Sequence, residues 1–123
     1  MMNNEKKYLN ILGEKVYLEV GTYDNNSRLG IQLFTEDGDL WNDLTRNLSS
    51  EPILSPYQAY LCNDITQETR NSIFQSGLIS YSLGKGLIGY ELVEFDIDKL
   101  REYDPVGVKK YEEDMNLSKM FYL

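Results

Sequence analysis

The feature that most constrains this chain is an alternation of apolar and polar residues in two neighbouring segments. Residues 15–23 and residues 29–34 both place an apolar side chain at every second position of their central part. Because successive side chains of a β-strand point to opposite faces of a sheet, this period of two predicts two strands, each with one buried face. The side chains expected on the buried face are Val16, Leu18, Val20, Leu29, Ile31 and Leu33.

Turn residues separate these strands and favour an antiparallel arrangement. Residues 24–27, Asp-Asn-Asn-Ser, form a turn cluster. The pair Asp37-Gly38 is a strong hairpin signal and predicts a further strand over residues 40–48. Residues 8–12 indicate a short leading strand.

The middle of the chain carries weaker strand signals. Residues 49–56 contain two prolines and are predicted to form a loop, and residues 57–62 are β-rich. Residues 79–86 are predicted to form a loop, and residues 87–95 a buried strand. The sheet is therefore expected to hold about four to six strands.

One central helix is predicted between the strands of the second half. Asp64 can cap its N-terminus, with Gln67 three residues later as in a capping box. Gly77 suits the left-handed position that follows a helix.

Two short helices are expected at the C-terminal end. Asp96 can cap the first, which ends near Tyr103. The second begins at Asp104-Pro105, since proline is favoured at the first helical position, and turns Val108 and Tyr111 inward. The apolar residues 120–123 would dock on the sheet or bind something, and docking is favoured. The order of elements predicts a single α+β domain over residues 1–123, with an antiparallel β-sheet, one central helix and short C-terminal helices.

The charge of the chain limits its partners. It has 20 acidic and 12 basic residues, a formal net charge of −8, which repels nucleic acid and anionic membranes and favours basic proteins. The excess lies in residues 36–51, with five acids against one base, and in residues 91–123, with nine acids against five bases. Two solvated faces that keep the protein dissolved would explain the same distribution.

The composition also argues against catalysis. The chain has no histidine, which removes the commonest general base and the commonest metal ligand. Its one cysteine, Cys62, is expected to be a buried, inert thiol. We therefore predict no catalytic residue, no cofactor and no metal. With no export signal, no disulfide framework and no long apolar run, the expected location is the cytoplasm.

Three motifs resemble functional sites only in part. Residues 82–86, Ser-Leu-Gly-Lys-Gly, lack the spacing of a phosphate-binding loop, so a flexible glycine loop is favoured. Asp37, Asp39 and Asp43 fit a calcium loop incompletely, and a hairpin turn is favoured. The third motif is a group of carboxylates that would mostly face water rather than converge in a pocket: Glu91, Glu94, Asp96 and Asp98.

Tyrosine is abundant, with 10 among 123 residues. Tyrosine is enriched at binding surfaces because it is rigid and amphipathic, although packing on the core is the alternative for each one. Tyr60 and Tyr90 are expected in the core. The tyrosines expected beside acids on wet faces are Tyr17, Tyr23, Tyr103 and Tyr111.

Three blocks of sequence carry a resemblance to a family. The first is Tyr-Leu-Glu-Val-Gly-Thr-Tyr at 17–23 with Leu-Gly-Ile-Gln-Leu at 29–33 and Glu-Asp-Gly at 36–38. The second is Ala-Tyr-Leu at 59–61, Asn-Asp at 63–64 and the helix ending in Gly-Leu at 77–78. The third, and most specific, contains Leu-Arg-Glu-Tyr-Asp-Pro-Val-Gly-Val at 100–108. Over residues 15–111 the chain resembles an uncharacterised family of small acidic proteins found on phages and conjugative elements of Gram-positive bacteria.

The resemblance implies a counter-defence inhibitor of the anti-CRISPR type. Such a protein would bind a Cas9-like nuclease through an acidic, DNA-mimicking surface and block DNA binding, because carboxylates accept bidentate arginine bonds as phosphates do. The alternatives are an acidic adaptor in plasmid transfer or replication, and a small enzyme. The residues expected to contact the partner are Glu36, Asp37, Asp39, Asp43, Glu91, Glu94, Asp98, Glu102, Tyr103, Tyr111, Glu112 and Glu113.

Overall fold

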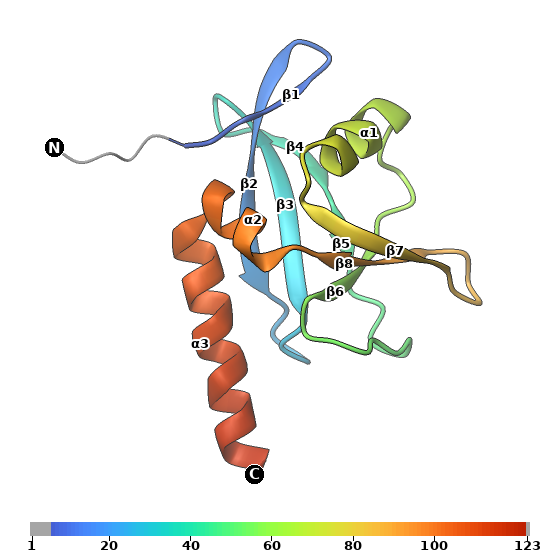
Figure 1. The fold of residues 1–123 in the computed structure, drawn as a ribbon, viewed down its shortest axis with the longest axis vertical. Coiled ribbons are helices and arrows are strands. Elements are labelled where there is room, and N and C mark those ends of the chain that lie inside the picture. Colours follow the sequence, from blue (N-terminus) through green and yellow to red (C-terminus); the bar gives the residue numbers. More distant parts are fainter. Residues whose placement is uncertain (1–5, 123) are drawn as a thin grey trace, which may run out of the picture.

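A computed structural model describes the backbone of residues 6–122 and the side chains of residues 6–116. These residues form two four-stranded antiparallel sheets and three helices (Figure 1). Sheet A comprises β1 (Leu9–Ile11), β2 (Glu14–Thr22), β3 (Leu29–Thr35) and β4 (Leu40–Asp43), in that order. Sheet B has the order β5-β6-β8-β7, with β5 (Thr45–Arg46), β6 (Gln58–Leu61), β7 (Ile79–Lys85) and β8 (Glu91–Phe95). The helices are α1 (Gln67–Gln75), α2 (Ile97–Tyr103) and α3 (Pro105–Tyr122). The predicted α+β class is confirmed.

Sheet A follows the alternation of the sequence closely. All the side chains predicted for the buried face of β2 and β3 are buried, and they join α1 and sheet B in one hydrophobic core. The two strands pair antiparallel from Val16↔Thr35 to Thr22↔Leu29, as the turn at residues 24–27 predicted. Since a strand shows its other face at every second residue, the opposite face of sheet A is left outside the core.

The strand predicted over residues 40–48 is wrong, because the chain changes sheets at Leu44. β4 ends at Asp43 in sheet A, and β5 begins at Thr45 in sheet B. Leu44 is buried in the core, its N–H donates to the carbonyl of Ile31 (3.0 Å), and its carbonyl accepts from the N–H of Cys62 (2.9 Å). A single residue thus bonds both sheets, which a strand pattern in the sequence does not reveal.

The predictions for residues 79–95 are also wrong. The predicted loop over residues 79–86 contains the whole of β7, and the predicted strand 87–95 begins only at Glu91. Between them the hairpin tip is exposed, and Leu87 is 100% accessible. β7 is an edge strand with two irregularities in its register, and it is exposed over nearly its whole length. A strand that buries so little needs no alternation of apolar and polar residues. The two serines and one glycine of β7 therefore gave its sequence the composition of a loop.

The central helix lies where it was predicted, but its cap is different. The N-cap is Thr66, whose hydroxyl accepts from the N–H of Thr69 at 3.1 Å, rather than Asp64. Asp64 instead accepts a hydrogen bond from Asn42 at 3.4 Å. Gly77 has a positive φ of 82° after the helix, as predicted.

The two C-terminal helices close the side of the core beside β2 (Figure 1). Asp96 caps α2 as predicted, accepting from the N–H groups of Asp98 and Lys99. α3 has 18 residues and is longer than the short helix expected. No helix in the described part of the chain is long and apolar enough to cross a membrane.

Asp104 and Gly107 explain why the block at residues 100–108 is specific. β1 pairs with residues 14–16 only, so the rest of β2 has a free edge there. Asp104 accepts from the Val20 N–H on that edge (2.8 Å) and from the Gly107 N–H at the start of α3 (3.0 Å). A Cβ atom on Gly107 would lie 2.6 Å from the Val20 carbonyl, so α3 can approach β2 this closely only with glycine.

Tyr111 points into the core, as does Val108, which confirms the inward face predicted for α3. Tyr111 is 1% exposed and its hydroxyl donates to the Pro56 carbonyl. Burial raises the pKa of its phenol to about 12. The prediction that Tyr111 lies on a wet face is therefore wrong. The prediction for residues 120–123 lies outside the described side chains.

Candidate binding surface

The outward face of sheet A is ordered in rows by the pairing of β2 with β3. One cross-strand pair is aromatic, Tyr17 with Phe34, the next is polar, Glu19 with Gln32, and the last consists of two glycines, Gly21 with Gly30. The buried residues of β2 alternate with these, so all three rows face away from the core. We call this face, extended by Tyr8, Lys15, Tyr23, Asp43 and Arg46, the open face of sheet A.

The aromatic row is packed and flanked by lysines. The rings of Tyr17 and Phe34 are stacked with centroids 5.5 Å apart, and Tyr8 meets Tyr17 edge-on at 6.2 Å. The ammonium of Lys6 lies 4.4 Å from the centre of the Tyr17 ring, and that of Lys15 lies 5.6 Å from the Tyr8 ring. This end of the open face is therefore aromatic and partly basic.

The polar row carries two exposed carboxylates with an amide between them. Gln32 is the cross-strand neighbour of Glu19 on one side and of Asp43 on the other. The amide of Gln32 donates to the Asp43 carboxylate at 2.8 Å. The middle of the open face is therefore negative.

The glycine row leaves a hollow in the open face. Its cavity is about 380 Å³, with Glu19, Gly21, Gln32, Asp43 and Arg46 among the lining residues. A Cβ atom on Gly21 would meet nothing within 4 Å, so the absence of a side chain at this position keeps the hollow open.

Tyr23 forms one wall of the hollow. Its ring stands over Gly30, where a Cβ atom would lie 3.0 Å from the ring. Its hydroxyl lies 3.0 Å from the Thr45 hydroxyl and 3.2 Å from the Thr45 carbonyl, and burial raises its pKa. Sequence reasoning found Tyr23 but not the hollow, and the signal that could have found it is the pairing of Gly21 with Gly30.

Four of the twelve predicted contact residues lie on one hairpin. Glu36, Asp37 and Asp39 are exposed at the turn that joins β3 to β4, and Asp43 is exposed on β4. Only Glu36 has a cationic neighbour among the described residues, at 3.9 Å from Lys15. We call these four residues the acidic hairpin.

Glu91 and Glu94 lie in sheet B instead. Glu91 is held by the guanidinium of Arg70, with N–O distances of 2.9 and 3.0 Å, and also accepts from Ser82. Glu94 accepts from Gln58 and from Tyr81. Both carboxylates are therefore engaged within the protein.

The acids of α2 and α3 are mostly paired as well. Arg101 contacts both Asp98 and Glu112, at 2.5 and 2.8 Å, and Lys7 contacts Glu102 at 2.8 Å. The hydrogen bond from Lys7 lowers the pKa of Glu102. Glu113 is exposed and makes no ion pair with another described residue.

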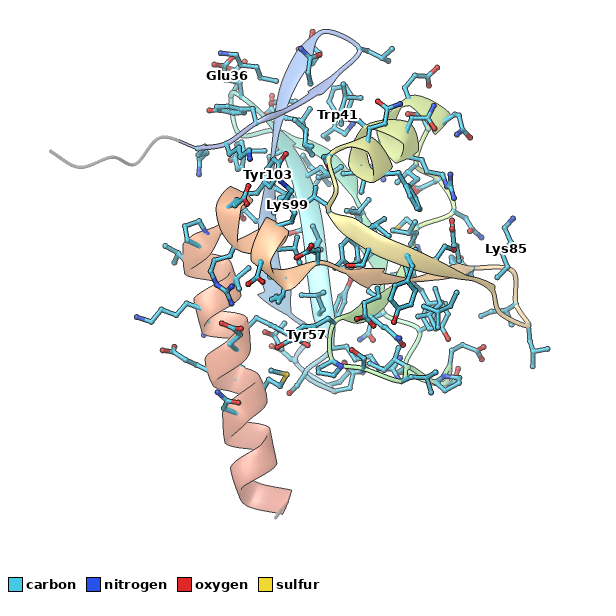
Figure 2. All side chains as sticks on the ribbon, in the orientation of Figure 1. Glu36, Trp41, Tyr57, Lys85, Lys99 and Tyr103 are labelled. Atoms are coloured by element: carbon cyan, nitrogen blue, oxygen red, sulfur yellow. The ribbon has the colours of Figure 1, made fainter. Side chains whose placement is uncertain are left out.

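The structure does not gather the twelve residues on one continuous face. Basic side chains lie between the groups, since Lys15 neighbours Glu36 and Lys7 binds Glu102. Figure 2 shows Glu36 at one end of the molecule, Tyr103 and Lys99 on α2, and Lys85 far from them on the β7–β8 hairpin. Among the described residues, the acidic hairpin is the group of predicted contacts whose carboxylates stay together and mostly lack an ion pair.

The two tyrosines predicted as anchors differ from each other. Tyr103 is half-buried, packs against the core, and carries Lys7 4.9 Å from its ring centre. Tyr111 is buried, so it is not available at a surface.

Cys62 is buried as predicted. It is 6% exposed, its thiol donates to the Thr45 carbonyl at 3.1 Å, and burial raises its pKa to about 11. Such a thiol is protonated at neutral pH and a poor nucleophile. The described side chains contain no group of three or more histidine, cysteine, aspartate or glutamate residues placed to hold a metal ion.

In comparison with known proteins, the chain matches one family model. Residues 17–115 match the family described as a domain of unknown function, DUF4313. The matched range is close to the residues 15–111 over which the resemblance was predicted, and it covers both sheets apart from β1 and the first three residues of β2. No curated protein and no solved structure matches the chain.

Proposed function

The chain belongs to the DUF4313 family, and we propose that it is a non-enzymatic protein that binds a basic, nucleic-acid-binding partner through the acidic hairpin. The observation that carries the proposal is the state of its carboxylates. Asp37 and Asp39 are exposed and form no ion pair with other described residues, and Asp43 is exposed and its carboxylate accepts, among these residues, only from the Gln32 amide at 2.8 Å. Most acids of α2, α3 and β8 are instead engaged inside the protein, several of them by an arginine. Free carboxylates are the ones that can pair with a partner.

The surroundings of the acidic hairpin suit a protein partner. Leu40, between Asp39 and Asp43, is 56% exposed and is the cross-strand neighbour of Phe34. An interface that combines an apolar contact with a charged rim is typical of protein–protein recognition. The charges at the rim would speed the encounter with a basic surface, and the apolar contact would add to affinity.

The choice of partner is guided by the resemblance of the sequence to small acidic proteins of phages and conjugative elements. We propose a Cas9-type nuclease, which holds nucleic acid in a positively charged channel and reads a short duplex motif with arginines. The acidic hairpin would compete for those arginines, because carboxylates accept bidentate bonds from guanidinium groups. The protein would then act as a counter-defence inhibitor that blocks DNA binding.

The test is a DNA-binding competition with a Cas9–guide complex at several salt concentrations. The wild-type protein is expected to displace DNA at low salt and to weaken as salt rises, since exposed charges are screened within about 10 Å at 0.1 M. Charge reversal in Asp37→Lys/Asp39→Lys is expected to slow association roughly tenfold while changing dissociation much less.

A matched control reverses two exposed acids outside the acidic hairpin, Asp24→Lys/Glu113→Lys, and so makes the same change in net charge. It is expected to compete nearly as well as wild type. Equal losses in both variants would show that only net charge matters, and the acidic hairpin would not be the site. No competition by the wild-type protein at low salt would overturn occupation of the DNA site.

A further inference from the structure

The proposed contact through the acidic hairpin does not use the hollow in the open face of sheet A, although Asp43 belongs to both. We propose that this hollow is a receptor for one arginine side chain of the partner. The inference rests on the proposed function, because that function supplies a basic protein partner. It goes further by naming the site that gives the contact its geometry.

The hollow is large enough for one side chain. Gly21 and Gly30 face each other across β2 and β3, so neither strand covers this part of the sheet with a side chain. The cavity of about 380 Å³ lies at the small end of the range of ligand sites and accommodates one long side chain. Its rim residues Glu19, Gly21 and Gln32 are exposed, so a partner can enter from solvent.

The aromatic wall of the hollow is held in place before a ligand binds. The Tyr23 hydroxyl is held by Thr45, which is only 2% exposed and whose own hydroxyl accepts from the N–H of Ile31 at 3.0 Å. The ring therefore does not need to be ordered when a ligand arrives. A planar guanidinium stacks on such a ring, which a lysine ammonium cannot do.

The charge of the lining residues favours a cation. Two carboxylates, Glu19 and Asp43, and one guanidinium, Arg46, line the hollow, so its net charge is negative. The Gln32 amide already donates to one oxygen of Asp43 and orients that carboxylate. A cation with several N–H donors in one plane satisfies these oxygens better than a point charge does.

The direct test is an NMR titration of the whole protein with N-acetyl-arginine amide, compared with N-acetyl-lysine amide. The arginine probe is expected to shift the backbone signals of Gly21, Gly30 and Gln32 at millimolar concentration, and the lysine probe to shift them less. Shifts spread over Asp37 and Asp39 instead, or equal effects of both probes, would overturn the proposal.

Gly21→Val places a branched side chain in the hollow at a position where a Cβ atom meets nothing within 4 Å, and valine suits a strand. The variant is expected to lose the arginine-induced shifts and to bind the nuclease roughly tenfold more weakly, as losses at a central contact do. The control is Ser80→Val, which places the same valine side chain at an exposed strand position of β7. It is expected to behave as wild type in both assays.

Two further variants test the sign of the ligand's charge. Asp43→Asn is expected to weaken arginine binding, and Arg46→Gln to strengthen it, each by several-fold, because they remove an attraction and a repulsion. The opposite order would show that the hollow holds an anion and would overturn the proposal.

The combined results separate this inference from the proposed function. If Gly21→Val binds the nuclease as tightly as wild type does, the hollow is not used and the acidic hairpin alone makes the contact. If the wild-type protein does not bind the nuclease but the arginine probe still binds beside Gly21, the arginine site stands and the proposed nuclease partner is refuted.

Discussion

Sheet A keeps one face against the core and the other against solvent, whereas sheet B has a fully covered strand at its centre and a bare strand at its edge. All four residues of β6 are buried, because the loop before it packs over the face that the core leaves free. In that loop the Pro52 carbonyl accepts from Tyr60 at 2.6 Å, and the Leu54 N–H donates to Gln58 at 2.8 Å. In β7 only the first residue is buried.

A binding surface is expected on sheet A rather than on sheet B. The open face of sheet A presents ordered rows on two long strands that are held by their buried faces, so its residues keep a regular spacing across the two strands. Sheet B has one face occupied by its own loop, and its exposed edge strand has two irregularities that twist it away from regular pairing. The uncovered face with regularly paired strands is therefore that of β2 and β3 in sheet A.

The largest expected effect tests the difference in burial between the two sheets. Leu33→Ala, at a fully buried position of β3, should lower the free energy of unfolding by about 2–5 kcal/mol, since it removes apolar contacts and leaves a cavity. Leu83→Ala, on β7, should lower it by about 0.5 kcal/mol or less. Urea titration followed by Trp41 fluorescence measures both. Equal losses would mean that β7 is buried in solution and would remove the contrast.

The contact between α3 and the edge of sheet A should come next in size. Asp104→Ala removes the cap of α3 and leaves the Val20 N–H without its acceptor, so we expect a loss of about 2–3 kcal/mol. Glu113→Ala, an exposed change on the same helix, should cost about 0.5 kcal/mol or less in the same urea titration. A small effect at Asp104 would show that α3 is not anchored on β2.

The link between α3 and the loop over sheet B should be sensitive to alkali. The pKa of Tyr111 is raised from 10 to about 12 in the folded protein, so its contribution is fully present below pH 10 and is lost as pH rises through 12. Stability should fall by roughly 1–2 kcal/mol between about pH 9 and 11, and Tyr111→Phe should flatten that fall. Cys62→Ala separates the thiol, whose pKa is raised from 9 to about 11.

A comparison variant for this pH dependence is Tyr81→Phe, because Tyr81 is 51% exposed on β7 and its pKa is raised mainly by its hydrogen bond to Glu94 rather than by burial. It should reduce the alkaline fall less than Tyr111→Phe does, since solvent screens an exposed interaction. A fall that is the same in wild type and Tyr111→Phe would show that another group causes it.

The smallest effect is expected at the tip of the β7–β8 hairpin. Leu87 is fully exposed, so Leu87→Ser should change the free energy of unfolding by less than about 0.5 kcal/mol. A loss above about 1 kcal/mol in the urea titration would show that the tip packs against the protein, and sheet B would then lack a bare edge.

The sequence predicted the parts of the fold in which local chemistry and burial agree. The alternation of β2 and β3, the Asp37-Gly38 turn, the cap at Asp96 and the helix start at Pro105 were all predicted correctly. Each depends on residues close together in the chain. The predictions failed at Leu44, which belongs to two sheets, and along β7, where the strand needs no buried face.

The candidate site was predictable only in part, for the same reason. The acids of the acidic hairpin are neighbours in sequence, so their grouping could be predicted. The hollow could not be, because it requires Gly21 to face Gly30, Tyr23 to reach Thr45, and Arg46 to lie nearby on another sheet. Nor could the sequence tell free acids from engaged ones, since Arg70 holds Glu91 across 21 residues of chain.

The sequence by itself therefore determined the fold class, the net charge and the local elements, because strand period, turn type and capping depend on a few adjacent residues. Only the tertiary structure decided which carboxylates remain free, which tyrosines are exposed and where the open face of sheet A is hollow. Those properties depend on distances between residues far apart in the chain, and such distances exist only once the two sheets and α3 have packed together.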